Sequence, residues 1–231
     1  MKKIALIPAR GGSKRIPNKN IKSFCGKPII AYPISTALES ALFDEVIVST
    51  DSMQIAQVAR EYGAKVPFMR PKELSDDFTP TAPVAQHAID VLNLHKEDLL
   101  CVIYPTAPLL TQETLALGLN ALIENPHKLF AFCAVAYDYN PYRSFCIAND
   151  EIEMLFPQHY LTRSQDLAQV YHDAGQFYWG RVEAWRENLP IFAPHSSTII
   201  VPNSQVQDID TLEDWTLAEM KYKLQYSTRG L

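Results

Sequence analysis

The 231-residue sequence lacks several features that would assign it to a common class of protein. It has no excess of basic residues. Its net charge of −5 argues against a bare nucleic-acid binder, because contacts to phosphates need a basic surface. Its four cysteines show no CxxC spacing, and three of them lie in apolar runs, so buried free thiols are expected. We find no internal repeat and no low-complexity tract.

The sequence also lacks a hydrophobic run long enough to cross a membrane. Its first residues begin like a signal peptide, but Arg10 and Gly11 end the run after six apolar or proline positions. Together with the cysteines, this predicts a reduced, soluble, cytoplasmic protein that has neither a membrane nor a nucleic acid as partner.

Apolar runs and helical patterns alternate about every dozen residues through the first 137 residues. Strands are expected at 3–9, 45–50, 65–69, 99–104 and 129–137, and helices at 28–41, 52–62, 81–94 and 111–125. This alternation predicts an α/β fold with a doubly wound, mostly parallel, Rossmann-like sheet.

The later part of the chain has a different pattern. A short β-excursion is expected at 141–157, an aromatic strand at 171–180, a further strand at 198–201 and a last helix at 211–224. No stretch rich in Gly, Ser or Pro divides the chain. We therefore expect one domain over 1–231, with 138–170 as an excursion that serves dimerisation or covers a site.

A basic loop follows the first expected strand. Residues 10–20 contain four cations and two glycines. Ligands of α/β sheets bind beyond the carboxyl ends of strands, and glycines let backbone N–H groups approach phosphates. The loop is neither a P-loop nor a GxGxxG dinucleotide motif. It predicts a phosphate site, with a solvated basic loop as the alternative.

Two carboxylates stand near the other end of the chain. Asp208 and Asp210 point the same way if the segment is extended. Such a pair suits Mg²⁺, which takes one or two carboxylates together with substrate phosphates. The alternative is a surface turn or an N-cap for the last helix, which the position of Asp210 directly before Thr211 would suit. A basic loop and a Mg²⁺ pair together predict a nucleotide-transfer site.

A third polar stretch surrounds the expected aromatic strand. Arg163 could pair with an anionic substrate group, and the strand could line a sugar pocket. The alternative is a structural hairpin, which we favour for Phe177 and Trp179. His172 and Asp173 are adjacent in sequence, but no nucleophile in a recognisable elbow completes a triad with them.

Five segments in order resemble the CMP–sugar acid synthetases, the acylneuraminate cytidylyltransferase family. They are the loop Ala9-Arg10-x-x-Ser13-Lys14-x-x-x-x-Lys19-Asn20, Arg70-Pro71-x-x-Leu74, Pro105-Thr106-x-Pro108-Leu109, Arg163-x-Gln165 and Asp208-Ile209-Asp210. The resemblance implies a nucleotidyltransferase that uses CTP and Mg²⁺ to attach CMP to the anomeric hydroxyl of a nine-carbon sugar acid, with release of pyrophosphate.

The resemblance also implies roles for individual residues. CTP would be bound by Arg10, Ser13, Lys14, Lys19, Asn20, Arg70 and Thr81. Mg²⁺ would be held by Asp208 and Asp210, which would be catalytic together with Arg10 and Lys19. The sugar would be bound by Tyr104, Arg143, Arg163, Gln165, Ala174 and Tyr178. The family implies a homodimer in which the excursion reaches over the partner's site.

The sugar is indicated by departures from the sialic acid synthetases. Tyr104 and Leu110 stand where those enzymes usually have Gln and Arg, and Ala174 stands where they usually have Asn. The resulting pocket is less polar and is similar to that of the pseudaminic acid cytidylyltransferases, whose sugar replaces two hydroxyls with an acylated amine and a deoxy methyl. The alternatives are a sialic or legionaminic acid synthetase, a glycosyltransferase, and a non-catalytic nucleotide-binding protein.

Overall fold

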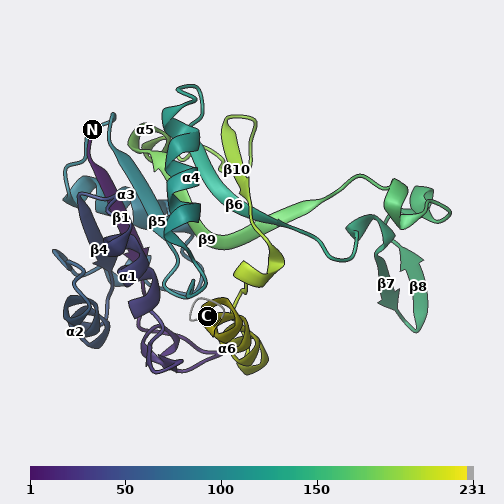
Figure 1. The fold of residues 1–231 in the computed structure, drawn as a ribbon, viewed down its shortest axis with the longest axis horizontal. Coiled ribbons are helices and arrows are strands. Elements are labelled where there is room, and N and C mark those ends of the chain that lie inside the picture. The colour runs from purple at the N-terminus through teal and green to yellow at the C-terminus, as the bar shows by residue number, and fades with distance from the viewer. Residues whose placement is uncertain (228–231) are drawn as a thin grey trace.

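The computed structural model describes residues 1–227, which are organised around a six-stranded sheet (Figure 1). The strand order is β10-β6-β9-β5-β1-β4. The strands are β1 (Lys3–Pro8), β4 (Glu45–Ser49), β5 (Leu99–Ile103), β6 (Phe130–Ala136), β9 (Tyr171–Arg181) and β10 (Ser196–Ile200). Strand β1 pairs in parallel with β4 and β5, and β6 pairs in parallel with β10. Only β9 runs antiparallel within this sheet, so the predicted doubly wound, mostly parallel sheet is confirmed.

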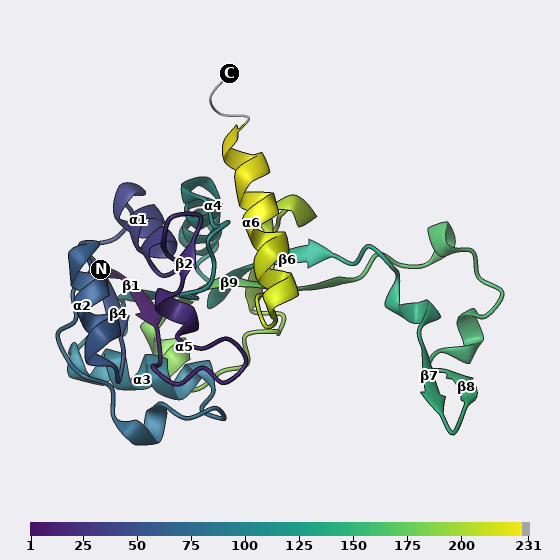
Figure 2. The ribbon, with the colours of Figure 1, turned by 90° about the horizontal axis from the view of Figure 1, so that it is seen from below.

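Helices cover both faces of the sheet (Figures 1 and 2). They are α1 (Ala31–Glu39), α2 (Met53–Glu61), α3 (Thr81–Val91), α4 (Gln112–Ile123) and α5 (Val182–Arg186). The last helix, α6 (Leu212–Ser227), instead packs through Trp215 and Ala218 in a separate apolar cluster with Phe24. Alternate strand residues pack against opposite layers: Ile7 faces the cluster under α1, α2 and α4, whereas Leu6 faces the cluster under α3 and α5. Each central strand is therefore apolar on both faces.

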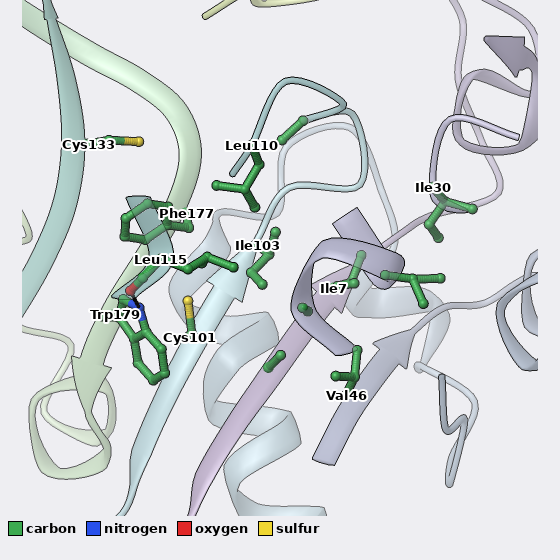
Figure 3. Packing of buried hydrophobic residues seen from close by; sticks show 14 of the residues in the cluster. Ile7, Ile30, Val46, Cys101, Ile103, Leu110, Leu115, Cys133, Phe177 and Trp179 are labelled. Carbon is green, nitrogen blue, oxygen red and sulfur yellow. Dashed lines mark hydrogen bonds between the residues drawn. The ribbon is translucent and has the colours of Figure 1, made fainter. Parts of the chain in front are cut away.

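The core beside α4 is tightly packed around Trp179, which β9 contributes (Figure 3). Its indole Nε1–H donates to the carbonyl of Leu115 at 3.0 Å, and its ring stacks on Phe43. Phe177 and Trp179 are thus core residues, as favoured from the sequence. Cys101 and Cys133 are buried free thiols, as predicted, whereas Cys146 is exposed.

Two expected elements differ from the structure. The first helix begins at Ala31 because Pro28 lies in a short β-hairpin of β2 (Ser23–Phe24) and β3 (Lys27–Pro28). Pro33 falls in the first turn of that helix, where a missing N–H costs no helical bond. The expected strand at 65–69 forms only two isolated bridges, to Ile47 of β4 and to Thr50 just after it, since Pro67 cannot donate a ladder hydrogen bond.

Residues 138–170 form an arm that leaves the sheet after β6 and returns as β9. Both views show the arm extending away from the other elements, with the hairpin of β7 (Phe145–Ala148) and β8 (Glu151–Met154) near its end (Figures 1 and 2). All four residues of β7 are exposed. No helix within residues 1–227 is long and apolar enough to cross a membrane.

Candidate active site

A cavity of about 450 Å³ opens at the carboxyl ends of β1 and β5, beside the start of α3. This is the edge of the sheet where α/β folds bind ligands. The structure brings together in its lining all seven residues predicted to bind CTP, namely Arg10, Ser13, Lys14, Lys19, Asn20, Arg70 and Thr81. Their contact with CTP stays a prediction.

The basic loop is shaped by contacts with its neighbours. The N–H of Gly11 donates to Asp51 Oδ1 at 2.7 Å, and a Cβ at Gly11 would lie only 3.0 Å from Ser52 Cβ. Glycine therefore lets the loop pack closely against the segment that starts α2. Farther along, Asn20 Nδ2 donates to the carbonyl of Arg10 at 2.9 Å and ties the two ends of the loop together.

Asp77 forms ion pairs with two cations of the cavity. Its carboxylate pairs with Arg10, and its Oδ2 lies 2.5 Å from Lys14 Nζ. These hydrogen bonds, that of Lys14 first, lower the pKa of Asp77, so it remains an anion. Arg70 is almost fully buried, and its Nε–H donates to Ser75 Oγ at 3.1 Å. Sequence analysis missed Asp77, which carries no local signal beyond its neighbour Asp76.

The carboxylate pair lies next to the basic loop and is linked to the cavity by Lys19. Lys19 Nζ donates to the carbonyl of Ile209 at 2.6 Å and lies 3.6 Å from Asp210 Oδ1. Burial lowers the pKa of Lys19, and Asp210 opposes that effect. Asp210 also pairs with Arg15 at 2.6 Å. The basic loop and the carboxylate pair, which are about 190 residues apart in the sequence, therefore lie side by side, as the sequence analysis expected.

Asp210 does not cap the last helix. The hydroxyl of Thr211 accepts the N–H of Asp214 at 3.1 Å, and Asp214 Oδ2 accepts the N–H of Thr211 at 2.8 Å. This reciprocal arrangement is a capping box with Thr211 as the cap. The alternative in which Asp210 serves only as a helix cap is therefore wrong.

The pair has the chemistry of a Mg²⁺ site that substrate would complete. Burial raises the pKa of Asp208, and repulsion from the nearby charge of Asp210 raises it further. Within residues 1–227 no three His, Cys, Asp or Glu side chains gather as a complete metal site. Two carboxylates nevertheless suit Mg²⁺, whose remaining ligands are commonly waters and phosphate oxygens. The donor set fits the ion, and the assignment stays a prediction.

The residues predicted to bind the sugar fall into two groups. Tyr104 lines the cavity, and Ala174 and Tyr178 are buried, with the Tyr178 ring 5.6 Å from that of Tyr104. The other group lies on the arm, where Arg163 Nε is 2.6 Å from Asp166 Oδ2 and Arg143 Nη1 is 3.3 Å from Ser164 Oγ. Neither these arginines nor Gln165 line the cavity of their own chain.

Sequence analysis missed a second cavity, of about 430 Å³, on the face of the sheet near the base of the arm. It is lined by Phe132, Ala134, Tyr137, Tyr171, His172, Asp173, Phe192 and Thr198. In the sequence, His172 and Asp173 were noted as a pair that makes no triad, and neither was assigned to a ligand. The remaining residues come from separate segments and form no local pattern.

Comparison with known proteins gives the family. A family model described as "Cytidylyltransferase" matches residues 4–197. The chain is 46% identical to the pseudaminic acid cytidylyltransferase of Campylobacter jejuni over 99% of both chains. It is 32% identical to the CMP-N,N'-diacetyllegionaminic acid synthase of Legionella pneumophila, with 97% of both chains covered.

A solved structure supports the fold. The CMP:2-keto-3-deoxy-manno-octonic acid synthetase complexed with CTP superposes with a TM-score of 0.72 at 19% identity, covering 98% of this chain and 100% of the other. The family model spans most of the chain, and the curated relatives match it from end to end. The chain belongs to the cytidylyltransferase family.

Proposed function

We propose that this protein transfers CMP from CTP to the anomeric hydroxyl of pseudaminic acid and releases pyrophosphate. One observation carries the proposal: the cationic wall of the nucleotide cavity meets the carboxylate pair through Lys19. A triphosphate in this cavity would have fixed positive charge on one side and, on the other, two carboxylates suited to hold Mg²⁺. The identity with a pseudaminic acid enzyme exceeds that with a legionaminic acid synthase, 46% against 32%.

The reaction needs neutralisation of negative charge. The oxygen of the sugar hydroxyl bonds to the α-phosphorus, and the bond from that phosphorus to the oxygen that bridges the α- and β-phosphates breaks. Pyrophosphate leaves with that oxygen, and the hydroxyl proton passes to solvent. Arg10, Lys14 and Lys19 supply fixed charge against the phosphate oxygens. Asp208 and Asp210 would hold Mg²⁺, which when bound neutralises further phosphate charge.

We further propose that the protein acts as a homodimer in which each arm completes the partner's sugar site. The hairpin of the arm exposes large apolar side chains, with Phe145 53%, Ile147 69% and Ile152 70% exposed. A two-stranded hairpin has little stability by itself, and clustered exposed apolar residues mark contact surfaces. The arm also carries Arg143, Arg163 and Gln165, which suit a carboxylate-bearing sugar.

Mixed dimers test this arrangement. Arg163→Ala leaves the nucleotide site intact, whereas Asp208→Asn leaves the arm intact. If the arm acts on the partner's site, dimers that combine the two inactive chains contain one wild-type site, and a random mixture regains about one quarter of wild-type turnover. No recovery, together with a monomeric mass in light scattering, refutes the proposal.

The substrate is tested by pyrophosphate release from CTP and Mg²⁺ with pseudaminic, sialic and legionaminic acids. Release with pseudaminic acid at the highest kcat/KM supports the proposal. Preference for another of the three keeps the chemistry and replaces the sugar. Release with none favours the non-catalytic or glycosyltransferase alternatives. A cytoplasmic location stays a prediction, in keeping with four free cysteines.

A further inference from the structure

Strand β9 departs from regular geometry between Asp173 and Tyr178. Tyr178 pairs with Phe132 and Asp173 with Ala134, so two steps along β6 correspond to five steps along β9. Gly175 lies in this irregular segment with φ of +60°, a conformation that glycine adopts without strain. On a regular strand, residues five apart lie about 17 Å apart and face opposite sides. Here the Tyr178 hydroxyl donates to Asp173 Oδ2.

The bulge fixes the Asp173 carboxylate. Besides the Tyr178 hydroxyl on one oxygen, the N–H of Gly175 donates to Oδ1 at 3.1 Å. Burial, then the adjacent Tyr104 and the charge of Asp173, raise the pKa of Tyr178, so its phenol stays protonated and remains a donor. Each carboxylate oxygen still has a lone pair for a further donor.

Two tyrosines join the two cavities. Tyr104 lines the nucleotide cavity, and its hydroxyl lies 3.3 Å from Thr81 Oγ1. Its ring meets the ring of Tyr178 edge to face, with centroids 5.6 Å apart. Tyr178 in turn holds Asp173, which lines the second cavity. A ligand in the second cavity would therefore lie across these rings from the nucleotide.

The lining of the second cavity defines its ligand. Its walls are aromatic: Phe132 and Phe192 meet edge to face at 5.0 Å, and the rings of Tyr137 and His172 lie 4.6 Å apart. Asp173 is the acidic group of this lining. Aromatic walls suit methyl and acyl groups, whereas a carboxylate accepts from N–H or O–H donors and repels another anion. The matching group is a neutral acylamino substituent rather than the acid end of a sugar.

We infer that the second cavity holds the acylamino end of the acceptor sugar and that Asp173, aimed by the bulge of β9, determines specificity by accepting a hydrogen bond from its N–H. The inference rests on the proposed function and assigns its acceptor end. Tyr178 is a positioning residue that holds Asp173, and the carboxylate of the sugar lies away from this cavity.

The test compares Asp173→Ala and Asp173→Asn with wild type, using whichever of pseudaminic, sialic and legionaminic acids wild type turns over best. Hydrogen bonds to charged groups predict that the sugar KM rises about tenfold or more for Asp173→Ala. The Kd for CTP, measured by calorimetry without sugar, should stay within about twofold because Asp173 lies outside the nucleotide cavity. Tyr178→Phe should raise the sugar KM less, since Gly175 still holds the carboxylate.

Asp90→Asn is the matched control, since this carboxylate lies on α3, pairs with Arg186 and lines neither cavity. Active wild type with unchanged sugar KM in both Asp173 variants overturns the inference alone. A parallel loss of CTP affinity and thermal stability overturns it as well, because that pattern means Asp173 only supports the strand. Turnover of no sugar acid by wild type overturns the proposed function and this inference together.

Discussion

Replacing Asp208 with asparagine should make the metal-free protein more stable and also inactive. Burial and the charge of Asp210 raise the pKa of Asp208, so its ionised form costs folding free energy at neutral pH. Asparagine keeps the shape and removes the charge. Stabilising substitutions commonly add about 0.5–2 kcal/mol. Because Asp208 reaches solvent, we expect the lower part, about 0.5–1 kcal/mol. For a chain of this length that corresponds to a Tm increase of roughly 1–4 °C.

The pH dependence of this difference identifies its cause. An acid whose folded-state pKa lies above its unfolded-state value destabilises the fold where it is ionised. The penalty is absent below the unfolded-state pKa and grows as the pH rises through the folded-state pKa. The Tm difference between the variant and wild type should be full near neutral pH, should shrink as the pH falls toward the unperturbed value of 3.8, and should approach zero only below that value.

The same substitution should remove the response to metal. Mg²⁺ with CTP should raise the Tm of wild type more than that of the variant. A metal that neutralises phosphate charge supplies several kcal/mol, and each 1.36 kcal/mol is tenfold in rate, so kcat should fall at least about 100-fold. Asp90→Asn, a surface carboxylate of α3, should change neither property. Near-normal Mg²⁺-dependent turnover would refute the metal assignment, and a lower Tm at neutral pH would refute the electrostatic argument.

Two further predictions concern the nucleotide cavity and the core. Asp77→Asn should raise CTP affinity severalfold at low salt, because Arg10 and Lys14 lose the carboxylate that competes with phosphate; calorimetry showing equal or weaker binding contradicts this. Gly118→Ala should destabilise the fold, since its Cβ would lie 2.7 Å from Phe177 Cε2 and 2.8 Å from Trp179 Cδ1. Overpacking costs about 1–3 kcal/mol and outweighs the gain of up to ~1 kcal/mol from replacing a helical glycine. Urea unfolding with an unchanged or higher midpoint contradicts that estimate.

The gathering of the seven predicted residues around one cavity could be foreseen because they lie in segments that are local in sequence. The loop that begins at Arg10 directly follows a buried strand, and Thr81 begins a helix beside that strand end. In a doubly wound sheet such positions converge without detailed knowledge of side-chain packing. The carboxylate pair was also local, and only its use as a helix cap had to be excluded by the capping box of Thr211.

The carboxylate of Asp77, which balances the cations of the cavity, could not be predicted in the same way. Asp77 lies in an irregular loop, and nothing in its sequence indicates that it pairs with Arg10 and Lys14, more than sixty residues away. The expected strand at 65–69 failed for the opposite reason, because the apolar pattern there was correct but Pro67 prevents a continuous ladder.

The bulge of β9 explains why the second cavity could not be foreseen from the sequence. Simple alternation places Asp173 on the same face as Phe177 and Trp179, which are core residues under α4. The extra residues around Gly175 reverse that assignment and move Asp173 to the face of Tyr178. The first cavity, which we propose binds the nucleotide, thus depends on regular strand ends, whereas the second cavity depends on one irregular segment. Changes in that segment can redirect the choice of sugar while the nucleotide cavity stays intact, which is why Asp173 should affect the KM for sugar and leave the affinity for CTP unchanged.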